Sequence, residues 1–188
     1  MSELNITKVF SGVVALKDVS VDIYPGEVHA ILGENGAGKS TLMNIISGVL
    51  SPEMGVISFD GQRVNPMSPE KAASLGVSIS YQHPAVLDDL SVLENLRVAL
   101  PDRVFEGGDP AEIARAMLDD VGLAIPLHAR ADTLTVAQKH LLEIAKALAT
   151  RPPVLILDEP TAGLDPIGAA GFDQLIRSLQ QTLDRKSV

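Results

Sequence analysis

The stretch Gly33–Ser40, GENGAGKS, decides the fold of this 188-residue chain. It matches G-x-x-x-x-G-K-[ST], a pattern in which glycines let successive backbone N–H groups turn inward around an anion. The apolar run VHAIL (28–32) before it predicts a strand. Apolar residues recur after it at helical spacing, at Leu42, Ile45, Ile46 and Val49. The N-terminus of that helix would lie at the anion, so we expect a phosphate-binding loop in an α/β fold.

Each residue of this loop has an expected role at a nucleoside triphosphate. Lys39 would reach the β- and γ-phosphates, and the Ser40 hydroxyl would hold Mg²⁺. The residues of the loop that we expect to contact ATP are Gly33, Asn35, Gly36, Ala37, Gly38, Lys39, Ser40 and Thr41. A glycine-rich turn that only connects a strand to a helix is the simpler alternative, but the motif and its context agree.

A second apolar strand, VLILD (154–158), brings two acidic residues, Asp158 and Glu159, to its carboxyl end. Open α/β sheets place their ligands at the carboxyl ends of such strands. Asp158 is the expected partner of Mg²⁺ through water, and Glu159 is the candidate base that orients the attacking water. An acidic transition from strand to loop is the alternative, and the phosphate loop earlier in the chain weighs against it.

Composition limits the class of protein. Hydrophobic residues make up 46% of the chain, charged residues 21%, and the net charge is −9. This acidic balance argues against a general nucleic-acid-binding surface, which needs clustered Lys and Arg. The chain has no cysteine, which excludes disulfides and thiolate metal sites. No apolar run approaches the ~20 residues that cross a bilayer.

The secondary-structure pattern changes twice along the chain. Alternation predicts strands at Val19–Ile23, Val56–Gly61 and Val77–Tyr81, with a short helix that begins at Ser68 and stops at Gly76. Three capping-box patterns then predict helices: Ser91 with Glu94, Asp109 with Glu112, and Thr135 with Gln138. Gly122 would close the middle one. We expect a core with an antiparallel β part at 1–90, a helical subdomain at 91–150, and a return to the core at 151–188.

Five motifs in a fixed order carry a family resemblance: GENGAGKSTL (33–42), SYQH (80–83), LTVAQ (134–138), LILDEPT (155–161) and AGLD (162–165). With these, the chain resembles the nucleotide-binding domain of an ABC transporter from near residue 4 to its end. The resemblance implies a P-loop NTPase core, a mostly parallel sheet flanked by helices, with an antiparallel β edge and an inserted helical subdomain. It also implies that two such domains sandwich two ATP molecules head to tail.

Further residues receive roles from this resemblance alone. Phe10 falls where the family stacks an aromatic ring on adenine; a core Phe on an edge strand is the alternative. Gln82 matches the glutamine that senses Mg²⁺ and the γ-phosphate. Asp165 matches the aspartate that contacts the opposite subunit, and it can also cap a last helix before Pro166.

The signature motif departs from the family. Leu-Ser-Gly-Gly-Gln is the usual form, whereas this chain has Leu134-Thr135-Val136-Ala137-Gln138. The resemblance implies that Thr135, Val136 and Gln138 face the ATP of the partner domain. Because the two lost glycines place Cβ atoms where that γ-phosphate approaches, we expect a weakened or asymmetric ATP site.

The stretches 134–148 and 33–49 are similar to the first nucleotide-binding half of bacterial monosaccharide importers. This implies a second nucleotide-binding domain, a membrane permease and a periplasmic solute-binding protein as partners, and a peripheral place on the cytoplasmic face of the inner membrane. No nucleic-acid partner is expected. The stretch 162–183 is closer to ordinary ABC ATPases, including those of lipid-trafficking systems.

The family also places a switch histidine after the last helix, and none of His29, His83, His128 and His140 lies beyond Asp165. We therefore expect a C-terminally truncated domain that binds nucleotide better than it hydrolyses it. Alternatives to a transport ATPase remain: an ABC ATPase acting on ribosomes or DNA, a degenerate half with a structural ATP site, and a nucleotide kinase. The first would be expected to show basic patches or a coiled-coil insertion, and the last would not need Gln82 or the 134–138 motif.

Overall fold

The computed structural model of the chain describes residues 1–24, 29, 31–65, 67–80 and 84–157. These residues fall into two compact units, one within Met1–Ser78 and the other within Ile79–Leu179, so that the boundary lies inside one strand. Whether the chain divides functionally at residues 90 and 150 stays a prediction.

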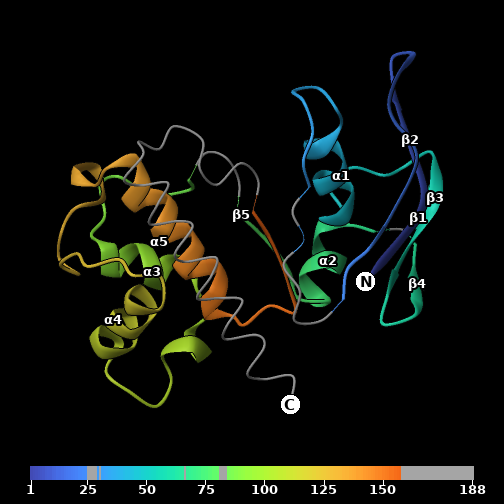
Figure 1. Cartoon of the computed structure of the whole chain (residues 1–188). Coiled ribbons are helices and arrows are strands. Elements are labelled where there is room, and N and C mark those ends of the chain that lie inside the picture. The colour runs from blue at the N-terminus through green and yellow to red at the C-terminus, as the bar shows by residue number, and fades with distance from the viewer. Residues whose placement is uncertain (25–28, 30, 66, 81–83, 158–188) are drawn as a thin grey trace. The chain divides into compact units, whose positions relative to one another are not determined.

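The first unit contains a four-stranded antiparallel sheet in the order β2-β1-β3-β4 (Figure 1). Its strands are β1 (Ser2–Phe10), β2 (Val13–Asp22), β3 (Met54–Phe59) and β4 (Gln62–Val64). The turns Ser11-Gly12 and Asp60-Gly61 have positive φ at both residues, the geometry that suits the twist of a two-residue hairpin. The predicted antiparallel β part and the strand at Val56–Gly61 are confirmed, while β2 begins earlier than the predicted Val19.

Two helices complete the first unit, α1 (Lys39–Ile46) and α2 (Pro69–Ser74), and both lie beside the sheet (Figure 1). Leu42, Ile45 and Ile46 are buried, as their spacing predicts. Val49 is 51% exposed, so its place on this helical face was wrong. The physical reason is Gly48, which has a φ of 78° and ends the helical run before Val49. The α2 cap is as predicted, because the Ser68 side chain accepts a hydrogen bond from the Lys71 N–H.

The strand predicted at 28–32 needs a correction at its described residues, whereas Val28 and Ala30 lie outside the described part of the chain. His29, Ile31 and Leu32, the residues of this run that the structure describes, are not in a strand, and Leu32 is 91% exposed. A short apolar run gives only a propensity for strand, and periodicity alone does not distinguish a strand from other apolar segments.

The second unit is mainly helical. It contains α3 (Val92–Ala99), α4 (Pro110–Asp120) and α5 (Val136–Ala149), with 3₁₀ turns at Asp102–Phe105 and Ala131–Thr133. The strands β5 (Val77–Ser80) and β6 (Val154–Leu157) form a two-stranded parallel sheet. The α/β fold class and the helical character of 91–150 are thereby confirmed. Within β6, Ile156 is buried and the other residues are half-buried.

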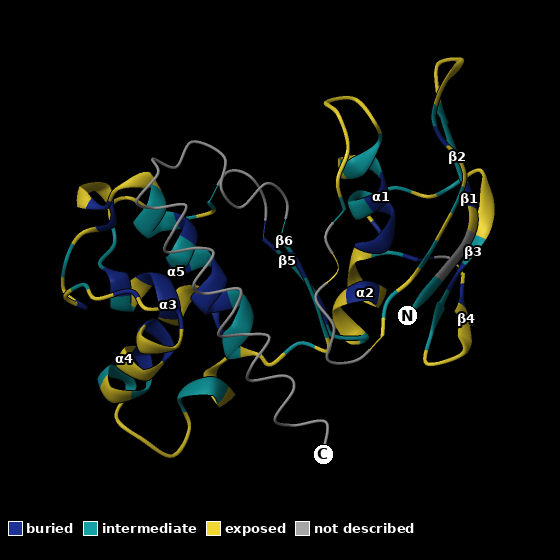
Figure 2. Cartoon of the chain, viewed as in Figure 1, coloured by how far each residue is buried: buried dark blue, intermediate teal, exposed yellow. Residues whose placement is uncertain are grey.

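Apolar residues of the three helices form one core in this unit, and Figure 2 shows buried residues on α3, α4 and α5. Val92, Leu96 and Leu142 are fully buried, and each contributes about 1.5–3 kcal/mol by leaving water. The capping boxes predicted at Ser91/Glu94 and Thr135/Gln138 are both present. The third was only half right, because Asp109 caps α4 by accepting from the Ala111 N–H without a reciprocal bond from Glu112. Gly122 follows the end of α4 with a φ of 66°, as expected.

Across the residues that the structure describes, no helix has both the length and the apolar character that a bilayer span requires.

Candidate functional site

The phosphate loop opens directly into α1. Gly36 and Gly38 have φ values of 84° and 91°, in the left-handed region that side chains rarely adopt. Gly38 is the N-cap of α1, and its carbonyl accepts the first helical hydrogen bond, from the Leu42 N–H. No side chain among the described residues caps this helix. The N–H groups of its first turn therefore face outward without a protein acceptor from a cap.

Gly38 also packs tightly against the β1–β2 hairpin. A Cβ atom on Gly38 would lie 2.5 Å from the Ala15 carbonyl oxygen and 2.7 Å from Leu16 Cδ2. Ala15 is a bulge, because it stands alone on β2 between the pairs Lys8/Leu16 and Val9/Val14. Only a glycine fits here, for space as well as for backbone conformation. The contact fixes the end of the loop against β2.

Lys39 folds back across the loop. Its ammonium donates to the carbonyl oxygens of Gly33 (2.8 Å) and Glu34 (3.1 Å), which holds a positive charge inside the loop. Ser40 is exposed on the first turn of α1, and Thr41 beside it is half-buried. The remaining predicted ATP contacts, Gly33, Asn35, Gly36 and Ala37, are exposed. The structure therefore brings the predicted phosphate-contacting residues together on one accessible loop.

Phe10 is the last residue of β1 and pairs with Val13 across the hairpin. Val13 lies two residues before Ala15, the bulge residue that contacts Gly38. It is 42% exposed, so it is not the core residue of the alternative interpretation. The Lys8 ammonium lies over its ring, 5.3 Å from the centroid, and donates to Glu53 Oε1 at 2.9 Å. This hydrogen bond from Lys8, with a second from the Val9 N–H, lowers the pKa of the Glu53 carboxyl.

Sequence reasoning missed Lys8 and Glu53. A signal existed for Lys8 alone: residues two apart on a strand share a face, so a Lys at position 8 lies on the face of Phe10. Glu53 lies 43 residues beyond Phe10 and gave no comparable signal.

The 134–138 stretch forms the start of α5. The Thr135 Oγ1 accepts from the Gln138 N–H (3.2 Å), and the Gln138 Oε1 accepts from the Thr135 N–H (2.9 Å). Val136, the first residue of the helix, is 53% exposed, and Leu134 is buried beneath it. The cap thus occupies the backbone N–H of Thr135 and Gln138, whereas those of Val136 and Ala137 belong to the uncapped first turn.

A segment just after Gln82 is anchored to this helix, which the sequence did not indicate. The Lys146 ammonium donates to the Ala85 carbonyl at 2.9 Å and forms an ion pair with Glu143. Lys139 pairs with Asp88 at 2.5 Å. Asn95 of α3, only 2% exposed, accepts from the Leu87 N–H and donates to the Leu87 carbonyl. We name Ala85–Asp88 the strap; three side chains fix it to α3 and α5.

Four predicted site residues lie outside the described part of the chain: Gln82, Asp158, Glu159 and Asp165. Strand β6 ends at Leu157, immediately before the two predicted carboxylates.

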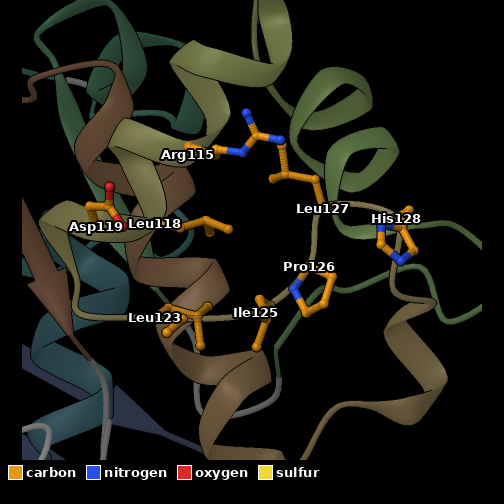
Figure 3. A pocket seen from close by; sticks show the side chains of 9 residues that line it. Arg115, Leu118, Asp119, Leu123, Ile125, Pro126, Leu127 and His128 are labelled. Carbon is orange, nitrogen blue, oxygen red and sulfur yellow. The ribbon is translucent and has the colours of Figure 1, made fainter.

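The second unit also has a surface pocket of about 420 Å³ between α4 and residues 123–128 (Figure 3). Its walls are mostly apolar, with Arg115, Asp119 and His128 as its charged or polar members, and all three are exposed. It contains none of the predicted site residues. The phosphate loop therefore remains the candidate site.

Comparisons with known proteins agree with this choice. The chain matches the ABC transporter family over residues 16–162. It is 42% identical over 179 residues to a ribose import ATP-binding protein of Rubrobacter xylanophilus, covering 94% of this chain and 36% of that protein. It is 41% identical over 171 residues to the D-allose import ATP-binding protein of Escherichia coli, covering 87% and 34%. The chain thus spans about a third of the length of these relatives.

Among solved structures, the chain is similar to an ATP-binding cassette determined as a dimer in a post-hydrolysis state with ADP and Pi. The TM-score is 0.79 and the identity 28%, over 97% of this chain and 84% of that one. The family match covers the phosphate loop, the 134–138 stretch and β6, the same elements that the geometry singles out. The chain belongs to the ABC transporter family, whose ATP-binding domain hydrolyses ATP.

Proposed function

We propose that this chain binds and hydrolyses ATP to power the import of a monosaccharide through a membrane permease. The observation that carries the proposal is the phosphate loop, with its two left-handed glycines and the Lys39 ammonium held inside it. Two relatives whose names state ribose and D-allose import support the sugar class.

At the phosphate loop, ATP would replace the carbonyls of Gly33 and Glu34 as the partner of Lys39. The β- and γ-phosphates carry full negative charges, and a charge-assisted hydrogen bond is about twice as strong as one to a neutral carbonyl. The outward N–H groups of the first turn of α1 add further donors, and the helix dipole favours the same negative charge. Phe10, on the hairpin that contacts Gly38, would stack on adenine.

The residues present fit a magnesium ion. Ser40 exposes a hydroxyl oxygen, a donor of the kind that Mg²⁺ prefers, on the turn that follows Lys39. Asp158 and Gln82 would complete the ligand set, the former through water. When bound, the ion neutralises charge that develops on the phosphate oxygens. Glu159 would orient the attacking water and accept its proton.

The second half of each ATP site would come from another nucleotide-binding domain. Thr135, Val136 and Gln138 lie at an exposed helix N-terminus, and Thr135 keeps a hydroxyl proton to donate after accepting from Gln138. The dimeric form of the similar ATP-binding cassette supports this arrangement. Asp165 would contact the opposite domain. The permease, a solute-binding protein and a peripheral position at the cytoplasmic face of the membrane follow from import by the relatives.

The test uses the full-length protein with its permease in proteoliposomes, with ATP and Mg²⁺ on the nucleotide-binding side. Wild type should hydrolyse ATP and move a monosaccharide such as ribose. Glu159→Gln should still bind ATP but lose turnover by about 100-fold or more, because the water is no longer activated. A Glu159→Gln protein that hydrolyses ATP at the wild-type rate overturns the assignment of the base. ATP hydrolysis that no monosaccharide stimulates overturns the sugar class.

A degenerate half-site that binds ATP with little turnover is the second candidate, and Val136 favours it. Its side chain is 53% exposed at the first position of α5, where a glycine in the usual signature would leave the γ-phosphate free to approach. The double change Val136→Gly with Ala137→Gly separates the two candidates. A large rise in turnover of the full-length protein supports the degenerate site, and an unchanged rate supports the working ATPase.

A further inference from the structure

Lys8 and Glu53 make several contacts at the end of β1, next to Phe10. Lys8 has only 13% of its side chain exposed, although lysine side chains normally extend into water. Its ammonium has three N–H groups. Two are used by the Ser51 carbonyl (2.7 Å) and Glu53 Oε1 (2.9 Å), and the ammonium also lies over the Phe10 ring at cation–π distance.

Glu53 fixes this lysine in place. Its backbone N–H donates to the Thr7 carbonyl at 3.0 Å, where β3 begins to pair with β1. Its second carboxylate oxygen accepts from the Val9 N–H at 2.9 Å. The Glu53 side chain thus supplies β1 with a hydrogen-bond acceptor beyond the first residue of β3. Glu53 therefore holds both the strand that bears Phe10 and the cation above the ring.

The same hairpin is fixed to the phosphate loop by the contact of Ala15 with Gly38. The Phe10 partner Val13 is two residues from Ala15, a distance of about 7 Å along the strand. The hairpin that bears Phe10 is thus fixed against the phosphate loop, and Lys8 lies over one face of the Phe10 ring. An incoming base can stack only on the other face.

We propose that Lys8 and Glu53 are positioning residues for adenine: they hold the Phe10 ring so that its uncovered face receives the base. The inference rests on the proposed function, since it takes Phe10 as the adenine contact. It explains why a partly exposed aromatic ring is held by a nearly buried lysine.

The experiment compares the affinities for ATP and for inorganic tripolyphosphate, which binds the phosphate loop but has no base. Lys8→Met keeps the length and apolar stem of the side chain and removes the charge. It should weaken ATP binding by about 3- to 10-fold and leave tripolyphosphate binding unchanged. Lys8→Arg, which keeps a cation over the ring, should restore most of the ATP affinity. Glu53→Gln should give a smaller loss with the same selectivity for ATP.

Phe10→Ala and Lys17→Met are the matched variants. Phe10→Ala should weaken ATP by about ten-fold, and adding Lys8→Met to it should cause no further loss. Lys17, an exposed lysine on the neighbouring strand, controls for the change in net charge and should have no effect.

The outcomes separate two failures. If Phe10→Ala leaves ATP binding intact, the adenine role in the proposed function fails, and this inference fails with it. If Phe10→Ala weakens ATP but Lys8→Met does not, or if Lys8→Met weakens tripolyphosphate equally, only the positioning role is overturned. Circular dichroism of each variant verifies that the sheet is intact before affinities are compared.

Discussion

The phosphate loop and the 134–138 stretch are both helix N-termini, yet they are built in opposite ways. At the phosphate loop the N-cap is Gly38 in the left-handed region, with no side-chain cap among the described residues. At α5 the N-cap is Thr135 in extended conformation, in a closed capping box with Gln138. The first helix leaves its N–H groups for a ligand, whereas the second satisfies part of them internally. Under the proposed function, the loop would bind an anion with its own N–H groups, whereas α5 would meet one only when another domain supplies it.

Removing the Lys39 charge from the phosphate loop should have the largest effect of these changes, a loss of ATP affinity. Lys39→Ala removes the ammonium that bridges the Gly33 and Glu34 carbonyls, and ATP affinity should fall by about 100-fold or more. Titration with a fluorescent ATP analogue measures this. Lys17→Ala changes the net charge equally and should leave the affinity unchanged. Retained affinity in Lys39→Ala would exclude the loop as the site of ATP binding.

Substitution by alanine should destabilise the fold by different amounts at the two left-handed glycines, Gly36 and Gly38. Gly38→Ala places its Cβ 2.5 Å from the Ala15 carbonyl, so it should cost about 3 kcal/mol of folding free energy, from strain and overlap together. Gly36→Ala has a similar φ but meets nothing within 4 Å, and it should cost only about 1 kcal/mol. Urea unfolding of both variants gives the comparison. Equal losses would show that backbone conformation, and not contact with β2, requires the glycine.

The capped helix should respond to loss of its cap. Thr135→Ala removes the acceptor of the Gln138 N–H and should lower the free energy of unfolding by about 1 kcal/mol. Thr135→Ser retains the hydroxyl and should be close to neutral. The urea midpoints report the difference. A neutral Thr135→Ala would mean that the box in α5 contributes nothing to the isolated chain.

The smallest effect concerns pH and separates the two capping boxes. The Ser91 hydroxyl and N–H hold the pKa of Glu94 below its ordinary value, so its stabilisation is present above the unfolded pKa and is lost as pH falls through the folded one. Gln138 in the α5 box is neutral, so that box should not titrate. Carbon NMR of the Glu94 carboxyl should follow the transition. A carboxyl that titrates at the ordinary glutamate pKa would contradict the bond to Ser91.

Sequence patterns predicted the parts of this molecule that depend on local chemistry. The phosphate loop, the caps at Ser68, Ser91 and Thr135, and the helical face of α1 up to Ile46 all follow from residues a few positions apart. The prediction for Val49 was wrong because Gly48, in the left-handed conformation, ends the helix before Val49 although the apolar spacing continues. In the run 28–32, the described residues lie outside strands and Leu32 is 91% exposed, so apolar character alone did not place a strand there.

Contacts between distant residues could not be predicted in the same way. Glu53 meets Lys8 across 45 positions, and Lys146 meets Ala85 across 61. No spacing rule links such pairs, because only the packed fold brings them together. The family resemblance assigned Phe10 its role without indicating the lysine that covers it. Sequence thus located the site, and the structure was needed to find what holds it.

The strap fixes the chain that follows β5 to α5. Lys139 and Lys146 are seven positions apart on α5, a distance of about 10 Å along the axis, which matches the extended length from Asp88 back to Ala85. The strap therefore runs antiparallel to α5 and is fixed to it at both ends. Four residues, 81–84, link Ser80 at the end of β5 to Ala85, so these two Cα atoms can never be more than about 17 Å apart. Any rotation of α5 relative to β5 is therefore limited by the extended length of residues 81–84.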